Sequence, residues 1–417
     1  MKERFPVAGY NWANHEIQDS AIRTPLTYIE LSDEALRDGQ QALVEVEPEE
    51  RDKKLYIETS SIFADKIDLG FPGSSEEQED EITRLAKHIR DNNISIKPMI
   101  TGRGASREDV ASILNVANGL DGFEIESYIF LDVSKERAKH EGWDRNDLIK
   151  KFLENTRSLV AHNIPVGVVL ERWSRTGPED QAEFIEMVLG EGIKFLILAD
   201  TQGVHNEKSL KNELRWTFAQ FGKKYPEVQY DAHFHNQRGL AVANSLIAAT
   251  EGINRIHVTP GGIGEGAGNT DYVTLLGNLN LDGYRDDVLR GKIKRIKDSY
   301  DIFGISVPRN APFHKGAFES SSGVHQSTFY KAAQELDTLS FYFCIDPEEV
   351  DEETTVLLNR MSGTAGVRYV LQIQEGLEIN DQMVAAVLEK AKKSRSVLSR
   401  ETILDAALRY NVDNSKK

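Results

Sequence analysis

Eight short β-rich runs alternate with longer amphipathic stretches over the first 262 residues of this 417-residue chain. The runs lie at residues 26–32, 65–71, 95–101, 122–129, 164–171, 194–201, 228–235 and 255–262. Each intervening stretch is long enough for one crossover helix, as at residues 240–250 (LAVANSLIAAT) after the seventh run. Eight consecutive strand–helix units predict an α/β fold with a closed (β/α)8 TIM barrel. A doubly wound open sheet is the alternative.

After about residue 300 the pattern becomes mainly helical. Helices are predicted at residues 323–336, 347–361, 380–394 and 399–411. The last of these has Ser399 in the position of an N-cap. We therefore predict a TIM-barrel domain over residues 27–300, followed by helical C-terminal subdomains over residues 301–417. Residues 1–26 show no clear periodicity, and we expect them to form an N-terminal arm.

Charge and cysteine content exclude several classes of protein. The formal net charge of -17 argues against a nucleic acid or an anionic membrane surface as the main partner. The single cysteine, Cys344, excludes an intramolecular disulfide and a cysteine-rich zinc site. The first residues, MKERFPVAGYNW, lack the apolar region of a signal peptide, and no apolar run approaches the roughly 18 residues that span a membrane. We expect a cytoplasmic protein.

Two histidines, His233 and His235, lie at the end of the seventh run. Because side chains alternate along a strand, both imidazoles point to one face and Phe234 points to the other. In a barrel that face is the interior mouth, where two neutral imidazoles provide two ligands for a divalent cation. The pair taken alone also fits two ordinary polar histidines at a strand end.

A second block, LRDGQQ at residues 36–41, follows the first run. Taken alone, Arg37 beside Asp38 fits a surface ion pair. In a barrel, however, the first and seventh strands open onto the same mouth, so Asp38 can add a hard anionic ligand to the histidine pair. Arg37 stays cationic at any working pH and is suited to stabilising a developing oxyanion.

A glycine-rich block, GGIGEGAGN at residues 261–269, follows the eighth run. Its glycines permit positive φ angles and close backbone approach. The block is a poor dinucleotide fingerprint, because no first-strand βαβ unit surrounds it. A phosphate-binding loop after the eighth strand fits a TIM barrel, and Asn269 is a candidate for a fourth, oxygen ligand.

Two histidines and one carboxylate leave room on a metal ion for a bidentate ligand. A 2-oxo acid fits, since it offers a carboxylate oxygen and a keto oxygen whose carbonyl the metal polarises as a Lewis acid. Mixed nitrogen and oxygen ligation suits Mg²⁺, Mn²⁺, Zn²⁺ or Co²⁺ and does not choose between them. A non-haem Fe(II) oxygenase uses the same ligand types and is the alternative.

The three blocks LRDGQQ, HFHNQRGLAVANS and GIGEGAGNT follow in this order at the ends of the first, seventh and eighth runs. Together they resemble the signature of the DRE-TIM metallolyase group, in the branch of the α-isopropylmalate, citramalate and homocitrate synthases. Residues 323–327 (GVHQS) and 345–371 also resemble the helical subdomains of α-isopropylmalate synthases. The resemblance covers the chain from about residue 27 onward. It implies a homodimeric acyltransferase that condenses acetyl-CoA with a 2-oxo acid.

The resemblance also implies roles for single residues. The metal ligands would be Asp38, His233 and His235, with Asn269 coordinating or nearby. Arg37 would stabilise the keto oxygen as it becomes an alkoxide, and Gln41 and Thr201 would contact the 2-oxo acid. Glu171 matches a carboxylate with an acid–base role, and His325 matches a histidine that reaches the active site of the partner subunit. Glu171 also fits a surface acid, and His325 a helix-cap or core histidine.

Four positions depart from the pattern of the branch. They are Ala35 for threonine, Gln237 for aspartate, Gly266 for arginine and Glu126 for a histidine of the fourth strand. The departures lie around the metal-ligand set and leave it intact. The chain also ends where the leucine-sensing domain of many isopropylmalate synthases begins, so we expect insensitivity to leucine.

The C-terminal resemblance favours 2-oxoisovalerate as the substrate, giving 2-isopropylmalate and CoA in leucine biosynthesis. Pyruvate and 2-oxoglutarate, the substrates of citramalate and homocitrate synthases, are the alternatives. The cleaving branch, such as HMG-CoA lyase, uses a cysteine in the loop after the eighth strand, and that loop has none here. A non-catalytic relative that binds metal or CoA is a further interpretation, which Gln237 and Gly266 support.

Overall fold

The computed structural model describes residues 10, 12, 15, 23, 26–42, 47–285, 291–334 and 342–410. The chain forms two compact units. The first comprises Met1–Val288 and Arg295–Ser306, and the second comprises Leu289–Lys294 and Val307–Lys417. No helix within the described ranges is long and apolar enough to cross a bilayer.

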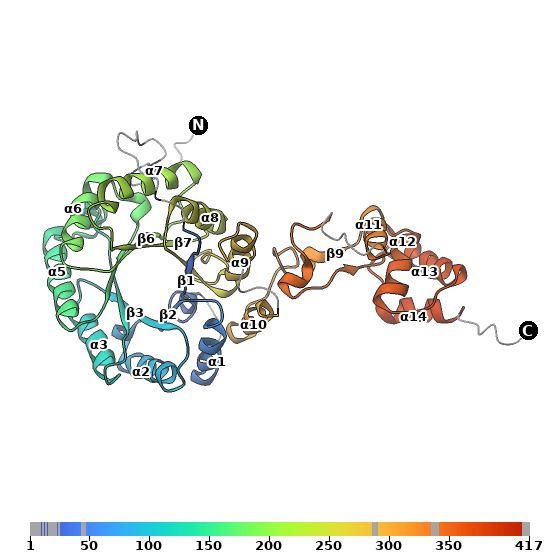
Figure 1. Ribbon diagram of the computed structural model, residues 1–417, viewed down its shortest axis with the longest axis horizontal. Helices are drawn as coiled ribbons and strands as arrows, with labels where there is room; N and C mark the ends of the chain where they lie inside the picture. Colours follow the sequence, from blue (N-terminus) through green and yellow to red (C-terminus); the bar gives the residue numbers. More distant parts are fainter. Residues whose placement is uncertain are drawn as a thin grey trace, which may run out of the picture. The chain divides into compact units, whose positions relative to one another are not determined.

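Eight parallel strands close into a barrel in the first unit (Figure 1). They are β1 (Glu30–Asp33), β2 (Lys66–Asp68), β3 (Lys97–Arg103), β4 (Glu126–Leu131), β5 (Val166–Leu170), β6 (Phe195–Asp200), β7 (Gln229–Phe234) and β8 (Arg255–Val258). Each strand pairs with its neighbours in sequence, and β1 pairs with β8 so that Ser32 lies opposite His257. Every strand overlaps one of the predicted runs. The predicted TIM barrel is confirmed, and the open sheet is excluded.

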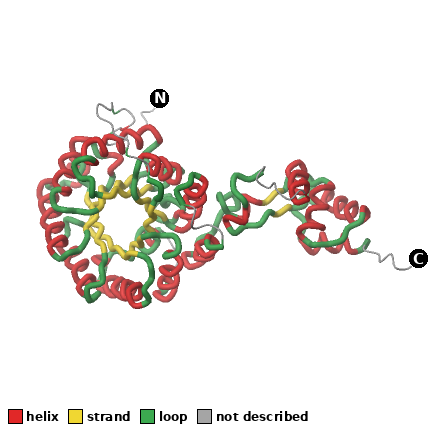
Figure 2. The backbone as a smooth tube through the Cα atoms, viewed as in Figure 1, coloured by secondary structure: helices red, strands yellow, loops and turns green. Residues whose placement is uncertain are grey.

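Helices form a ring around the strands (Figure 2). They are α1 (Glu50–Ser60), α2 (Glu76–Asp91), α3 (Arg107–Asn118), α4 (Lys135–Glu141), α5 (Arg145–Ala161), α6 (Pro178–Leu189), α7 (Glu207–Thr217), α8 (Ala241–Glu251) and α9 (Tyr272–Leu281). The side chains of Ser75, Ser106, Asp144, Asn206 and Asp271 cap α2, α3, α5, α7 and α9 by accepting a backbone N–H of the first turn. In α2 the buried residues are Ile82, Leu85, Ala86 and Ile89, the spacing that turns one apolar face toward the core.

Charged side chains fill much of the barrel interior, where bulky apolar residues are the usual filling. Lys66, Glu126, Asp231, Arg255 and His257 are all buried there. Lys66 forms an ion pair with Glu126, and Arg255 Nη1 donates to Asp231 Oδ2 at 2.7 Å. Pairing of this kind offsets the large cost of taking a charge out of water. The interior therefore carries polar groups from one end of the barrel to the other.

The second unit is built from short helices and one small sheet. Its elements are β9 (Glu319–Ser320), α11 (Gly323–Gln334), β10 (Thr355–Val356), α12 (Thr364–Arg368), α13 (Asp381–Lys393) and α14 (Arg400–Leu408), while α10 (Ile293–Asp298) spans the division between the units. Apolar residues such as Phe329, Val367, Val387 and Ile403 form its core. The helices predicted at residues 323–336, 380–394 and 399–411 are confirmed over the parts of these ranges that the structure describes.

The helix predicted over residues 347–361 is wrong. A single 3₁₀ turn, Pro347–Val350, is followed by Asp351 with a φ of 54°, a left-handed conformation that does not continue a helix. The chain then extends into β10, which pairs with β9, and Leu357 N donates to Ser320 O at 2.8 Å. The backbone hydrogen bonds of this segment therefore go to another strand, a tertiary contact that helix-like spacing does not reveal.

Most of the predicted arm, residues 1–26, lies outside the described residues. Trp12 is described, and only 1% of its surface is exposed. Its Nε1 donates to Thr176 O at 3.2 Å, and its carbonyl oxygen accepts Asn212 Nδ2 at 3.0 Å. This part of the N-terminal segment is thus packed into the barrel unit.

Candidate active site

A cavity of about 340 Å³ lies at the carboxyl ends of the strands. Its wall includes Glu34, Arg37, Asp38 and Gln41 after β1, Thr101 in β3, Glu171 and Arg172 after β5, Thr201 after β6, His233 and His235 at the end of β7, and His257 in β8. A larger cavity, of about 620 Å³, lies at the opposite end, among first residues of strands such as Glu30, Lys66 and Arg255. TIM-barrel enzymes place their chemistry at the carboxyl ends, so the smaller cavity is the candidate site.

Asp38, His233 and His235 meet at the wall of this cavity. The Nε2 atom of His233 lies 3.1 Å from Asp38 Oδ2, and the Nε2 atom of His235 lies 3.4 Å from the same oxygen. The two Nε2 atoms are 3.1 Å apart. All three side chains are buried, and their candidate ligand atoms lie within 4.8 Å of one another. The group could therefore hold a single metal ion.

Local structure explains how the three side chains converge. His233 is an inward-facing residue of β7, and His235 follows that strand directly, with Phe234 buried between them on the other side. Asp38 lies at the start of a 3₁₀ turn, Gly39–Gln41, that begins soon after β1. Because all strands of the barrel are parallel, these ends come together although they lie far apart in sequence.

Asn269 completes the group from the loop after β8. Its Nδ2 donates to Asp38 Oδ2 at 3.0 Å, while its Oδ1 is buried and has no hydrogen-bond partner among the described residues. Gly264 permits this close packing, since its φ is 150° and a Cβ there would lie 2.2 Å from Asn269 Nδ2. Buried acceptors almost always have a partner. The unpartnered oxygen beside Asp38 therefore fits a set of donors that surrounds a cation.

The protonation states of the group also fit a cation. Burial, followed by the neighbouring His233, lowers the pKa of His235 to about 4, so its imidazole is neutral and can act as a ligand. Burial alone would raise the pKa of Asp38, but Arg37 and the two histidines outweigh it and hold that pKa well below its usual range. The site thus presents one carboxylate and a neutral nitrogen ligand.

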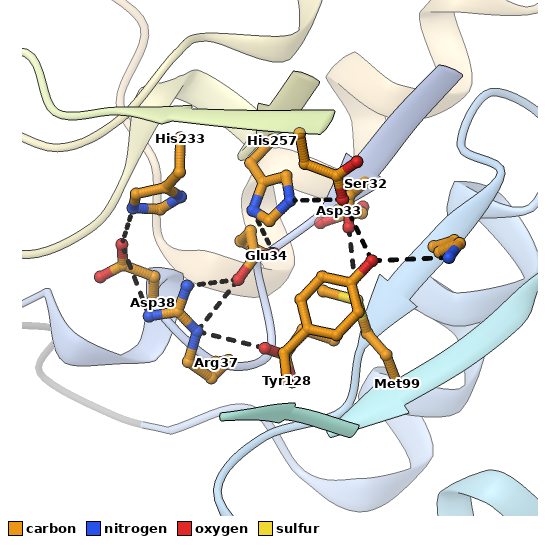
Figure 3. A network of polar contacts seen from close by, with 12 residues as sticks. Ser32, Asp33, Glu34, Arg37, Asp38, Met99, Tyr128, His233 and His257 are labelled. Atoms are coloured by element: carbon orange, nitrogen blue, oxygen red, sulfur yellow. Dashed lines mark hydrogen bonds and ion pairs between the residues drawn. The ribbon is translucent and has the colours of Figure 1, made fainter. Parts of the chain in front are cut away.

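Arg37 lies beside this group within a cluster of three carboxylates, of which Figure 3 labels Glu34 and Asp38. Its Nε donates to Glu34 Oε2 at 3.0 Å and to Asp68 Oδ2 at 3.2 Å, and its Nη1 lies 3.8 Å from Asp38 Oδ2. Burial and the nearby Glu34 raise the pKa of Asp68 to about 7. Arg37 keeps the pKa of Glu34 below its usual range despite the burial of that carboxyl. The guanidinium is therefore held firmly at the cavity wall.

His257 lies on the other side of Glu34. Its Nδ1 is 2.8 Å from Glu34 Oε1, and its Nε2 is 3.5 Å from Asp231 Oδ2. Burial alone would lower the pKa of His257, but the two carboxylates outweigh it and raise the pKa to about 9. Glu34, His233 and His257 form a second group whose candidate ligand atoms lie within 4.8 Å of one another.

The other residues singled out from the sequence fall in two places. Gln41, Glu171 and Thr201 line the same cavity as Arg37 and the metal-ligand candidates. Burial and the nearby Asp132 raise the pKa of Glu171. His325 lies on α11 in the second unit, where its exposed ring lies 5.0 Å from the ring of Tyr342.

The sequence interpretation missed several side chains of the cavity region, among them Glu34, Asp68, Arg172 and His257. His257 had a detectable signal, because Arg255, His257 and Thr259 alternate along the eighth run in the way that singled out His233 and His235. Glu34 and Asp68 are acids at strand ends, Glu34 follows another acid, Asp33, and Arg172 follows Glu171 directly. Spacing alone does not distinguish such residues from surface charges.

Comparison with known proteins gives one family match. The model of the HMGL-like family matches residues 28–299. A 2-isopropylmalate synthase of Sulfolobus acidocaldarius is 26% identical over 397 residues, covering 93% of this chain and 96% of that protein. A homocitrate synthase of the same organism is 24% identical, covering 88% and 75%. A provisionally named (R)-citramalate synthase of Methanopyrus kandleri is 27% identical, covering 90% and 70%.

Solved structures with the same fold include enzymes with other activities. The HMG-CoA lyase of Bacillus subtilis superposes with a TM-score of 0.56 at 18% identity, covering 69% of this chain and 97% of that one. The carboxyl transferase domain of Rhizobium etli pyruvate carboxylase has a TM-score of 0.53 at 12% identity, covering 97% and 77%. At these identities the superpositions establish the fold alone.

Proposed function

The chain belongs to the HMGL-like family, and from this premise we propose that it condenses acetyl-CoA with a 2-oxo acid and releases CoA. The observation that carries the proposal is the buried Asp38–His233–His235 group beside Arg37 in one cavity. The relatives named 2-isopropylmalate, homocitrate and citramalate synthases support it, since they align with most of the chain.

Asp38, His233 and His235 would hold the divalent cation, with Asn269 beside them. When bound, the cation supplies Lewis-acid polarisation of the keto group. Arg37 donates hydrogen bonds to the keto oxygen as negative charge develops on it. Gln41 and Thr201 orient the 2-oxo acid in the cavity.

Glu171 is the proposed base. Its raised pKa suits a carboxylate that must accept a proton near neutral pH. It takes a proton from the methyl group of acetyl-CoA, and the resulting enolate carbon forms a bond to the keto carbon. The keto oxygen becomes an alkoxide held by Arg37 and takes a proton from solvent, and Glu171 returns its proton to solvent. Water cleaves the thioester and releases CoA. His325 is the alternative base, which a homodimer would bring to this cavity from the partner subunit.

The preferred substrate is 2-oxoisovalerate. One wall of the cavity carries the apolar side chains of Phe71, Phe130, Val169 and Ile197, which suit a branched alkyl group. A 2-oxo dicarboxylate such as 2-oxoglutarate is the second candidate, and Arg172 favours it. Arg172 lines the cavity, where its Nη1 donates to Asp132 Oδ2 at 3.1 Å, and it places a cation there for a second carboxylate.

The test is CoA release by the full-length chain with acetyl-CoA and a panel of 2-oxo acids, each with Mg²⁺, Mn²⁺, Zn²⁺ or Co²⁺. We expect release only when acetyl-CoA and a 2-oxo acid are both present. With a dicarboxylate substrate, Arg172→Gln should raise KM about 10- to 100-fold, the effect of losing a hydrogen bond to a charged group; with 2-oxoisovalerate it should change KM little. Metal and oxo-acid binding without any CoA release would favour the non-catalytic interpretation.

A further inference from the structure

Glu34 lies between the guanidinium of Arg37 and the imidazole of His257, which contact different oxygens of its carboxylate. Its Oε2 accepts Nε of Arg37 at 3.0 Å and also Nη2 of Arg37. Its Oε1 lies 2.8 Å from His257 Nδ1, and neither of those two atoms has another hydrogen-bond partner among the described residues. Only 1% of Glu34 and 3% of His257 is exposed. The contact between them is therefore shielded from water and strong.

His257 also contacts a second carboxylate, on the side of its ring away from Glu34. Its Nε2 lies 3.5 Å from Asp231 Oδ2, and that oxygen accepts Arg255 Nη1 at 2.7 Å and Tyr128 Oη at 3.0 Å. Figure 3 shows His257 and Arg37 on opposite sides of Glu34. A continuous column of buried polar side chains thus runs from the middle of the barrel to the cavity wall.

The three carboxylates around Arg37 do not hold it equally. Asp38 faces the histidines and approaches Arg37 only to 3.8 Å, and Asp68 contacts Nε alone while also accepting Thr101 Oγ1 at 2.5 Å. Glu34 contacts both Nε and Nη2, so it sets the plane of the guanidinium. Nη1, which lies on the side of Asp38, is left as the donor nearest the metal-ligand candidates.

From this geometry we propose that His257 is a positioning residue: it fixes Glu34, and Glu34 fixes the guanidinium of Arg37 toward the reacting keto oxygen. The expected effect on kcat rests on the proposed function. The orientation of Arg37 by His257 and Glu34 does not depend on which reaction the chain catalyses. Because Arg37 would act on a developing charge, its misplacement lowers kcat more than it weakens substrate binding.

Positioning can be measured without turnover. In the full-length chain labelled with ¹⁵N-arginine, the Nε–H resonance of Arg37 is identified by its loss in Arg37→Lys. We expect this resonance to be sharp in the wild type, lost to exchange in His257→Leu, and retained in His257→Gln, whose amide can still donate to Glu34. The matched control is His205→Leu, which removes a histidine 2.9 Å from the equally buried Glu213 and should leave the Arg37 resonance unchanged.

Kinetics test the consequence. His257→Leu should lower kcat for CoA release about 10- to 100-fold, the range that small misplacements of a catalytic group produce, with KM for the 2-oxo acid changed less than about 3-fold and bound metal unchanged. Glu34→Gln combined with His257→Leu should lose no more than Glu34→Gln alone, since both act through one guanidinium.

Three results would overturn the proposal. They are an unchanged Arg37 resonance in His257→Leu, additive losses in the double variant, or a wild type that binds two metal ions of which His257→Leu loses one. The last result would assign Glu34, His233 and His257 to a second cation site. If His257→Leu does not fold, the Arg37 resonance in Glu34→Gln tests the positioning instead, and an unchanged resonance there overturns it. A wild type that releases no CoA contradicts the proposed function, while the resonance still decides the positioning.

Discussion

Two buried histidine–glutamate pairs lie in the barrel unit, and the pKa values of their histidines are shifted in opposite directions. His257 Nδ1 lies 2.8 Å from Glu34 Oε1 at the cavity, and His205 Nε2 lies 2.9 Å from Glu213 Oε2 away from it. All four side chains are at most 3% exposed. Yet the pKa of His257 is raised to about 9, whereas burial lowers the pKa of His205 to about 4.

The difference comes from what surrounds each pair. Asp231 lies behind His257 and Arg37 lies behind Glu34, so each member of the cavity pair is stabilised in its charged form. Around the other pair, burial dominates and raises the pKa of Glu213 well above its usual range. Burial thus disfavours the charged form of both partners there. The same two residue types are thus shifted toward their charged forms at the cavity and toward their neutral forms away from it.

The largest effect on the cavity is expected from Asp38→Ala. This change removes the carboxylate of the candidate metal group and leaves two imidazoles and Asn269. We expect the affinity for Mn²⁺ or Zn²⁺ to fall by more than about 100-fold, because changes to the outer partners of metal ligands alone cost 10- to 100-fold. CoA release should be lost with it. Calorimetric titration of metal into the purified chain measures the first effect, and normal turnover with normal metal content would remove the ligand assignment.

The sequence predicted the features that come from repeated or closely spaced residues, namely the barrel strands and the metal-ligand candidates. The eight strands follow from the alternation of apolar runs and helical stretches, and the strand period places His233 and His235 on one face. Parallel strands of one barrel then bring Asp38 to the same mouth. These inferences depend on local spacing and on a single topological rule.

The rest depended on contacts that spacing does not encode. Glu34 and His257 belong to chain segments that meet at the closure of the barrel, and their sequence contexts look like ordinary strand ends. The charge states of the His257 and His205 pairs could not be told apart either, because they are set by Asp231, Arg37 and the depth of burial. The helix prediction for residues 347–361 was wrong for a similar reason, since the backbone hydrogen bonds of this segment go to another strand.

The two pairs predict opposite pH dependence of stability in the metal-free chain. The pKa of His257 rises from 6.5 to about 9 on folding, so its contribution is full below pH 6.5 and is lost as the pH rises through 9. The pKa of His205 falls from 6.5 to about 4, so its contribution is present above pH 6.5 and is lost as the pH falls through 4. Each shift corresponds to about 3 kcal/mol.

Urea unfolding at several pH values, with a chelator present, measures these two dependences. The difference between the wild type and His257→Gln should shrink between pH 6.5 and 9, and the difference between the wild type and His205→Gln should shrink between pH 6.5 and 4. Each variant serves as the control for the other, because the barrel and its remaining groups are shared. Slopes of the same sign would mean that the two pairs have the same charge state.

The smallest effect is expected from Glu213→Gln. If Glu213 is protonated at neutral pH, glutamine reproduces its shape and can still accept Nε2 of Gln181 and donate to His205. The free energy of unfolding at pH 7 should then change by less than about 1.5 kcal/mol, as for other volume-conserving changes, and CoA release should be unchanged. Glu34→Gln, by contrast, removes a charge that Arg37 contacts directly and should slow CoA release at least about 10-fold. A loss of about 3–5 kcal/mol in Glu213→Gln, the cost of breaking a buried ion pair, would show that both pairs are ionised and that position in the barrel does not decide their charge.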